Sequence, residues 1–220
     1  TGASESIADM PEHWQRCLRG EGDVDLRGTN ILSDAYYMWP RNSVRSRLNA
    51  FLGSKAVRGK VDAVAEVDLP AFFKGHMRGS LYRLQDLVLD VPSLLATLGK
   101  LCQQHIYQID WGNTHIEHDA EGQVQRLVLH NGIKLQARLF ISTCGEGSEE
   151  LLGKLSPKGV GMQKRPLQMV VVRHQIQHPL YVHCVSDQMS TTPELTVTTH
   201  RCRDGQQAWY LGGALAESGA

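Results

Sequence analysis

Two glycine-rich patterns that hold nucleotide phosphates are absent from this chain of 220 residues. It contains neither a Gly-x-Gly-x-x-Gly loop nor a Gly-x-x-x-x-Gly-Lys-Ser/Thr loop, whose backbone amides bind a pyrophosphate or a triphosphate. Gly20-Glu21-Gly22 and Gly145-Glu146-Gly147 both lack the third glycine. The chain therefore carries no complete phosphate-binding motif of its own.

Charge and hydropathy argue against two further kinds of partner. The 23 basic side chains balance the 23 acidic ones, so there is no basic excess to attract nucleic acid or an anionic membrane. No apolar run approaches the roughly 20 residues that a membrane-spanning helix needs. We expect a globular protein that binds neither nucleic acid nor membrane.

The cysteines argue against a disulfide framework and against a zinc site. There are five of them, an odd number, and no two have Cys-x-x-Cys spacing. His174, His178 and His183 lie close together in sequence, but their nearest candidate co-ligand, Cys184, alternates with His183 to the opposite face of a strand. We expect reduced thiols, a cytoplasmic protein and no bound metal.

The strongest local pattern is a β-hairpin at Asn131-Gly132. Both residues tolerate the positive φ that a two-residue type I′ turn requires. Every second residue from Ile133 to Ile141 is apolar, which predicts a strand over residues 133–141 paired with residues 125–129. The loop Thr143-Cys144-Gly145-Glu146 then leads to Ser148, which is typical of a helix N-cap.

Other elements follow from the same rules. Helices are predicted for residues 7–19, after Asn42 or Ser43, and after Asp90, with a single turn at residues 71–74. After Gly161 four apolar runs predict an antiparallel meander, namely residues 168–176, 180–185, 195–200 and 208–211. The fold class is therefore α+β (or α/β), with a boundary that divides residues 1–157 from 158–220.

Two groups of side chains invite a functional interpretation. The aromatic run Tyr36-Tyr37-Met38-Trp39 is more typical of core packing than of a ligand site. Arg165, Arg173, Arg201 and Arg203 lie on or beside the predicted sheet, where a guanidinium can bind both oxygens of a substrate carboxylate. Most of these arginines are expected to be surface charge.

The order of these pieces resembles the middle of the FAD-dependent oxidoreductases of the D-amino-acid-oxidase-like superfamily. The matching pieces are Asp90-Val91-Pro92, the hairpin at Asn131-Gly132 and the loop Ser142-Thr143-Cys144-Gly145. Arg165-Pro166-Leu167-Gln168 stands where that family often has Arg-Gly-Gln, and Trp209-Tyr210-Leu211-Gly212-Gly213 resembles its Tyr-x-Gly-Gly strand. The resemblance runs from about Leu81 to Ala220.

The resemblance implies a cofactor and a set of site residues. It implies FAD in the full-length protein, with contacts from Thr114, Thr143, Cys144, Gly145 and Glu146, and it implies a substrate- or flavin-facing position for Arg165 and Gln168. The family's opening phosphate-binding loop and its closing cofactor-contacting segment have no counterpart here. We therefore expect a central fragment of a longer oxidoreductase, with little or no FAD bound to it alone.

Two functions remain open from the sequence. One is part of a FAD-dependent oxidoreductase that oxidises a C–N or C–O bond of a small molecule, with the rest of the parent polypeptide as its partner. The other is a non-catalytic α+β binding domain that offers an open sheet face to a partner. No catalytic residue can be named for either.

Overall fold

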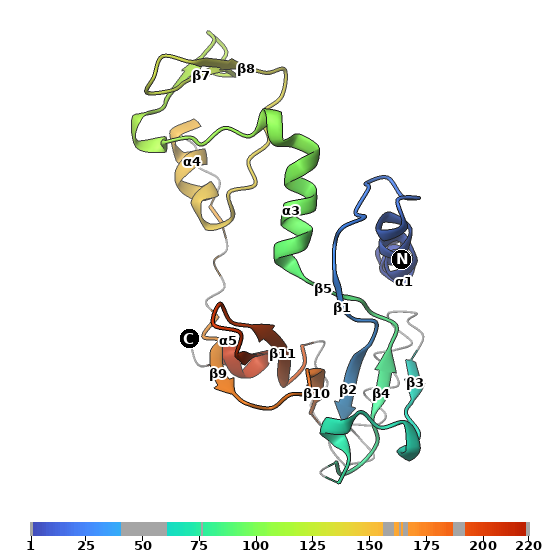
Figure 1. Cartoon of the computed structure of the whole chain (residues 1–220). Helices are drawn as coiled ribbons and strands as arrows, with labels where there is room; N and C mark the ends of the chain where they lie inside the picture. Colours follow the sequence, from blue (N-terminus) through green and yellow to red (C-terminus); the bar gives the residue numbers. More distant parts are fainter. Residues whose placement is uncertain are drawn as a thin grey trace. The chain divides into compact units, whose positions relative to one another are not determined.

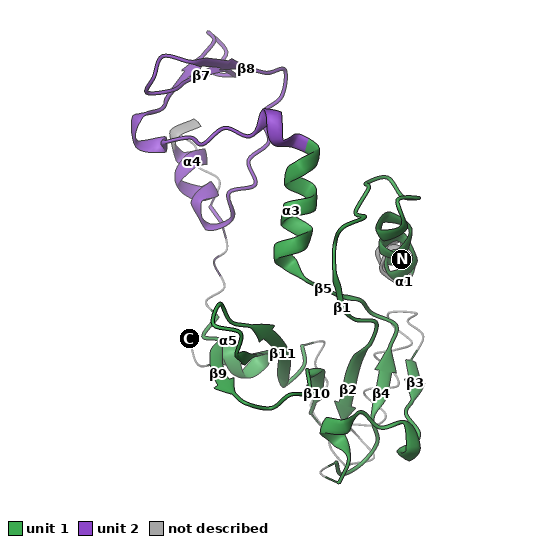
Figure 2. Ribbon diagram, viewed as in Figure 1, with its two compact units in different colours: residues 1–101, 166–220 green, residues 102–165 purple. Residues whose placement is uncertain are grey.

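The computed structural model describes residues 2–40, 61–75, 77–155, 161–162, 164, 167–186 and 192–218. The chain forms two compact units (Figure 2). One consists of residues 1–101 together with 166–220, and the other of residues 102–165. The predicted boundary between residues 157 and 158 lies near the end of the second unit, but segments from both sides of it share the first unit.

A seven-stranded mixed sheet forms the centre of the first unit (Figure 1). Its spatial order is β3-β4-β2-β10-β11-β12-β9. Every neighbouring pair is antiparallel except β2 and β10, which run parallel. The strands are β2 (Tyr36–Pro40), β3 (Val61–Ala63), β4 (Tyr82–Leu84), β9 (Val170–His174), β10 (Tyr181–Val185), β11 (Leu195–Arg201) and β12 (Gln207–Gly212).

The four predicted C-terminal strands exist, but they do not form the simple meander that the sequence predicts. Strand β9 lies beside β12 at the edge of the sheet, and β10 lies beside β2. Three strand spacings of about 4.8 Å separate β9 from β10, and the residues 175–180 that join them can span about 20 Å when extended. The connection from β9 to β10 can therefore cross the sheet. The sequence of a short apolar strand does not show which strand it will pair with.

The hydrophobic core lies on one face of this sheet. Phe73, from the turn η2 (Ala71–Phe73), is 1% exposed and packs against Tyr37 and Trp39 of β2, with ring centroids 5.9 and 5.7 Å apart. Val182 and Val197 belong to the same cluster. The aromatic run in β2 thus supplies core packing through Tyr37 and Trp39, as its composition indicates.

Helices and a two-stranded sheet complete the first unit. The helices are α1 (Gly2–Arg19), which ends at Gly20 with φ +76°, α3 (Val91–Cys102) and α5 (Ala214–Ser218). Asp90 caps α3, because its Oδ2 accepts a hydrogen bond from the Ser93 amide at 3.0 Å. The small sheet pairs β1 (Ile31–Ser33) with β5 (Val88–Leu89). A short 3₁₀ turn, η1 (Glu66–Asp68), follows β3. The helix predicted after Asn42 lies outside the described residues.

The second unit contains a three-stranded antiparallel sheet and a short helix. The sheet is formed by β6 (His115–His118), β7 (Val124–Val128) and β8 (Lys134–Gln136) in that order. The helix α4 (Ser148–Leu155) follows the turn η5 (Gly145–Gly147), and η3 (Gln103–His105) and η4 (Trp111–Asn113) precede the sheet. In the part of the chain that the structure describes, no helix is long and apolar enough to cross a membrane.

The predicted hairpin is confirmed, but two of its details are wrong. The second strand ends at Gln136 rather than at Ile141. The Gly132 amide donates to Leu129 O at 2.9 Å, which places His130 and Asn131 at the centre of the turn and Gly132, with φ +81°, after it. This is a three-residue loop with a glycine bulge rather than a two-residue type I′ turn.

The same loop closes two other hairpins. Gly122 and Gly205 have φ of +81° and +84°, and their amides donate to Asp119 O and Cys202 O in the same way. Asn131 and Asp204 each use a side-chain oxygen to accept the amide two residues later. Three hairpins therefore share one turn chemistry, in which only glycine meets the positive φ without strain.

Candidate functional site

The loop of the predicted cofactor contacts, Thr143 to Glu146, lies between β8 and α4 and is exposed. Gly145 has φ +54°, and a Cβ built on it would meet no heavy atom within 4 Å. Its glycine is therefore required by backbone conformation and not by close approach of another described segment. The Gly147 amide donates to Cys144 O at 3.1 Å, and the Ser142 hydroxyl lies 3.4 Å from that of Ser148.

The electrostatics of this loop do not suit a pyrophosphate. Glu149 and Glu150 stand in the first turn of α4, and Glu146 stands in η5 just before it. These carboxylates complement the positive end of the helix dipole and repel a second anion. A hydrogen bond from Lys164, 3.0 Å away, lowers the pKa of Glu149, so it stays ionised. The residues present do not fit the phosphates of FAD. The loop still offers its backbone groups and the exposed side chains of Thr143 and Cys144 to a cofactor.

Thr114 belongs to the same compact unit, where its side chain is part of a local turn. Its hydroxyl donates to Asp110 O at 2.6 Å. Asp110 accepts hydrogen bonds from Asn113 Nδ2 and from the Gly112 amide, which lower the pKa of that carboxyl. Among the described residues no hydrogen bond joins Thr114 to the loop at 143–146.

The two predicted substrate-facing residues are placed differently. Arg165 lies outside the described residues. Gln168 lies in the first unit just before β9, where its backbone amide donates to Ala216 O at 3.0 Å and its side chain is exposed. The structure thus does not bring Gln168 together with the loop at 143–146 in one unit.

Arg173 is already paired with a carboxylate. Its guanidinium donates to Asp204, in the turn between β11 and β12, and this hydrogen bond raises the pKa of Arg173. An arginine that binds an internal aspartate cannot offer both of its forked donors to a ligand. Arg173 therefore belongs with the surface charges, as most of these arginines were expected to.

One group of side chains was missed by the sequence reasoning. We call it the histidine face, the surface of the large sheet opposite the core, which carries Tyr36, His183, Thr196, Thr198, His200 and Tyr210. Tyr36 stacks on His183 with ring centroids 4.4 Å apart, and the hydroxyl of Thr196 lies 3.0 Å from His183 Nδ1. His200 makes matching contacts with Tyr210, at 4.2 Å, and with Thr198, at 3.0 Å.

Burial keeps these groups uncharged near neutral pH. It lowers the pKa of His183, an effect that Asp86 opposes, and it lowers the pKa of His200. Burial also raises the pKa of the Tyr36 hydroxyl. Neutral imidazole, phenol and hydroxyl groups both donate and accept hydrogen bonds. Polar residues at every second position, as in Thr196-x-Thr198-x-His200, were the pattern that could have revealed this face.

The thiol of Cys184, the residue after His183, lies on the core face of the sheet. Cys184 packs against the core cluster, and burial raises its pKa to about 11. His183 and Cys184 therefore lie on opposite faces of β10, as their alternation predicts. Among the described residues no group of three or more potential ligands is arranged to hold a metal ion.

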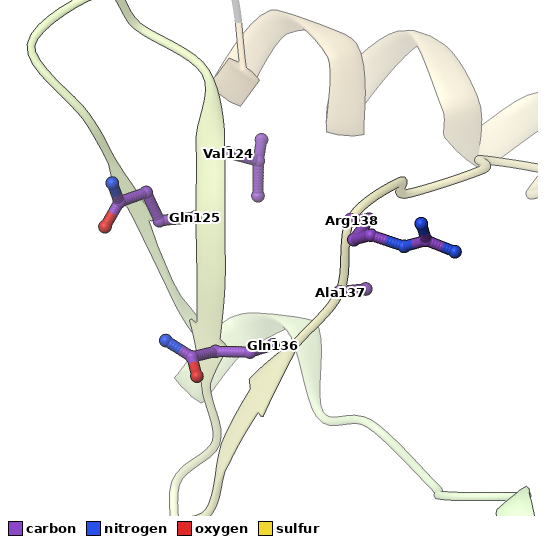
Figure 3. A pocket seen from close by; sticks show the side chains of 5 residues that line it. All are labelled: Val124, Gln125, Gln136, Ala137 and Arg138. Carbon is purple, nitrogen blue, oxygen red and sulfur yellow. The ribbon is translucent and has the colours of Figure 1, made fainter.

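An open depression in the second unit offers little to a ligand. It is lined by Val124, Gln125, Gln136, Ala137 and Arg138. Figure 3 shows the two glutamine side chains and Arg138 pointing in different directions. A binding site needs polar groups that converge on a ligand inside a concave wall. We therefore assign no ligand to this depression.

Comparison with known proteins gives one consistent answer. No protein-family model matches the chain. It is 40% identical over 219 residues to the probable FAD-dependent oxidoreductase PA4991 of Pseudomonas aeruginosa, covering 99% of this chain and 54% of that protein. The crystal structure of the FAD-dependent oxidoreductase PA4991 matches with a TM-score of 0.77 at 34% identity, over 98% of this chain and 53% of the other. The chain therefore spans about half the length of the relative it matches.

Proposed function

We propose that this chain is the central part of a FAD-dependent oxidoreductase that oxidises a C–N or C–O bond of a small molecule. The observation that carries the proposal is the 40% identity to a probable FAD-dependent oxidoreductase over 99% of the chain. The match of the α+β structure at a TM-score of 0.77 supports it. The order of helix, hairpin, glycine loop and late sheet supports the resemblance to the D-amino-acid-oxidase-like superfamily.

In this proposal the chain supplies the surroundings of the flavin and not its phosphate site. When bound, FAD accepts a hydride from the substrate, while the protein orients the two and tunes the charge around them. Backbone groups of Thr143, Cys144, Gly145 and Glu146 contact the cofactor away from its phosphates, because the acidic helix start repels them. Backbone groups of Thr114 contact the adenine.

The sheet of the first unit lies on the substrate side in this proposal. Arg165 and Gln168 precede β9 and face the substrate or the flavin. A proline disfavours a helical conformation in the residue before it, so the sequence Arg165-Pro166 predicts an extended backbone at Arg165.

The first experiment compares two polypeptides. One is the 220-residue chain. The other is a longer polypeptide that also contains the part corresponding to the rest of the PA4991 relative. Both are purified, and their flavin content is measured by visible absorbance after denaturation. We expect about one FAD per longer polypeptide and almost none per chain alone. A longer polypeptide without flavin would contradict the proposal and favour a non-catalytic binding domain. A yellow 220-residue chain would show that the loop at Gly145 binds phosphate after all.

A second experiment addresses the substrate bond and Arg165. The flavin-loaded longer polypeptide is mixed anaerobically with panels of amines and of alcohols or hydroxy acids, and bleaching of the flavin identifies the oxidised bond. Arg165→Ala should lower kcat/KM about ten- to a hundredfold, since a lost charged hydrogen bond costs about 1.5–3 kcal/mol. Arg173→Ala is the matched control and should change kcat/KM little. Unchanged kinetics in Arg165→Ala would remove Arg165 from the site.

A further inference from the structure

Three buried polar atoms at the β9–β12 edge have no hydrogen-bond partner among the described residues. They are His174 Nε2, Gln207 Oε1 and Trp209 Nε1. A buried donor or acceptor left unpaired costs about 1–3 kcal/mol, so three together call for a physical explanation.

The three side chains gather on one face of the sheet. Gln207 lies directly opposite His174 in the antiparallel ladder, and Trp209 follows Gln207 by two residues on the same strand. The rings of His174 and Trp209 have centroids 4.3 Å apart. Phe72 packs edge-on against Trp209 at 5.6 Å and belongs with the core side of this corner. All three side chains are half-buried, with His174 on the edge strand β9 and Gln207 and Trp209 on its neighbour β12, so the corner lies at the edge of the sheet.

The donor and acceptor roles of the three atoms are defined. The Ile176 amide donates to His174 Nδ1 at 3.1 Å, so the neutral ring carries its proton on Nε2. The indole nitrogen of Trp209 is a donor only, and the Oε1 atom of Gln207 is an acceptor only. The corner therefore presents two N–H donors and one acceptor.

We propose that His174, Gln207 and Trp209 form a binding site for one hydroxyl oxygen, supplied by a water molecule or by an alcohol. Such an oxygen accepts two hydrogen bonds and donates one, which matches the three atoms one for one. A carboxylate would place its charge against the Gln207 oxygen, and an ammonium would leave both N–H groups unpaired. The site does not depend on the oxidoreductase assignment, because it rests only on these three atoms.

The test uses the indole protons of the 220-residue chain, labelled with ¹⁵N. Trp39 is an internal reference, since its Nε1 donates to Arg78 O at 3.1 Å and needs no water. We expect a nuclear Overhauser cross-peak from long-lived water to the Trp209 indole proton and none to that of Trp39. Titration with a small alcohol separates the two sources: loss of the water cross-peak with a shift of the Trp209 signal identifies an alcohol site, and an unchanged spectrum identifies a water site.

Variants sharpen the result. Gln207→Leu removes the acceptor and should shorten the water lifetime, so that the Trp209 cross-peak weakens several-fold. Tyr210→Phe removes a hydroxyl from the opposite face of the same strand and should leave the cross-peak unchanged. The proposal is overturned if Trp209 shows no water contact in the parent chain. It is also overturned if Gln207→Leu shifts the Trp209 indole signal, as loss of a direct bond to the Gln207 oxygen would, while the water cross-peak stays unchanged.

Discussion

The two compact units differ in how they bury apolar side chains. In the first unit Phe73 and Val182, each 1% exposed, anchor a cluster on one face of the seven-stranded sheet. In the second unit Leu139 and Ile141 are 72% and 77% exposed, although they follow a well-formed hairpin. The second unit buries Leu127 and Leu129 but leaves much of its apolar surface in water, whereas the first unit has an extended core cluster.

The largest effect should come from the core of the first unit. Phe73→Ala should lower the free energy of unfolding by about 3–5 kcal/mol, because it leaves a cavity beneath Tyr37 and Trp39. Urea unfolding followed by tryptophan fluorescence measures the loss. Val67→Ala, at a side chain that is 81% exposed, is the control and should change it by less than about 0.5 kcal/mol. Equal effects would mean that Phe73 does not anchor a core in the first unit.

Backbone strain in the second unit should have the next largest effect. Gly132→Ala should cost about 1–2 kcal/mol, because φ of +81° is unfavourable for a residue with a Cβ and the added atom meets nothing else. Gly153→Ala, in α4 and equally free of contacts, should instead stabilise by up to about 1 kcal/mol. Hydrogen exchange measures both effects, at the β7 and β8 amides for Gly132→Ala and at the α4 amides for Gly153→Ala. A Gly132→Ala variant with unchanged protection would show that the turn tolerates a side chain.

Acid should weaken the first unit through its histidine face. Burial lowers the pKa of His183 in the folded state, so below the ordinary histidine pKa of about 6.5 the unfolded chain binds a proton that the folded chain excludes. Stability is therefore full above about pH 6.5 and falls below it, with at most about 1.4 kcal/mol per pH unit from this group. The groups around His183 are Tyr36, Thr196 and Asp86. The charge of Asp86 raises the pKa of His183 and so reduces the effect of burial. His183→Asn should flatten the pH profile of urea unfolding, and an unchanged slope would contradict this.

The smallest effect should come from the exposed apolar residues of the second unit. Leu139→Gln should change the unfolding free energy of the 220-residue chain by less than about 0.5 kcal/mol, because the side chain is already in water. The same substitution in the longer polypeptide sharpens the comparison. A loss there of more than about 1.5 kcal/mol, measured by thermal unfolding, would show that the additional half covers this side chain.

Local elements of the fold could be predicted from the sequence, and the reason is local physics. The cap at Asp90, the helix that ends at Gly20 and the hairpin at Gly132 depend on residues within a few positions of one another. The predicted length of the second hairpin strand was wrong: Ala137, Leu139 and Ile141 continue the apolar positions, but this segment pairs with no strand among the described residues. An alternating pattern indicates suitability for a sheet, while the partner decides whether a strand forms.

Long-range arrangement and most of the candidate site could not be predicted. The parallel pairing of Tyr37 with Val182 and the edge position of β9 depend on contacts between distant segments. The stack of Tyr36 on His183 and the corner formed by His174, Gln207 and Trp209 arise only once those registers are set. Arg165, Thr114 and the loop at 143–146 came from the family resemblance, and their roles stay predictions.

The parallel pairing of β2 with β10 has a consequence for the order of folding. Because it joins residues near position 37 to residues near position 182, this pairing must wait during synthesis until most of the chain has left the ribosome. The hairpins β6–β7–β8 need only neighbouring residues and can close much earlier. During that interval the aromatic side chains of β2 have no β10 to pack beside, so this is the period when we expect the nascent protein to depend most on chaperones.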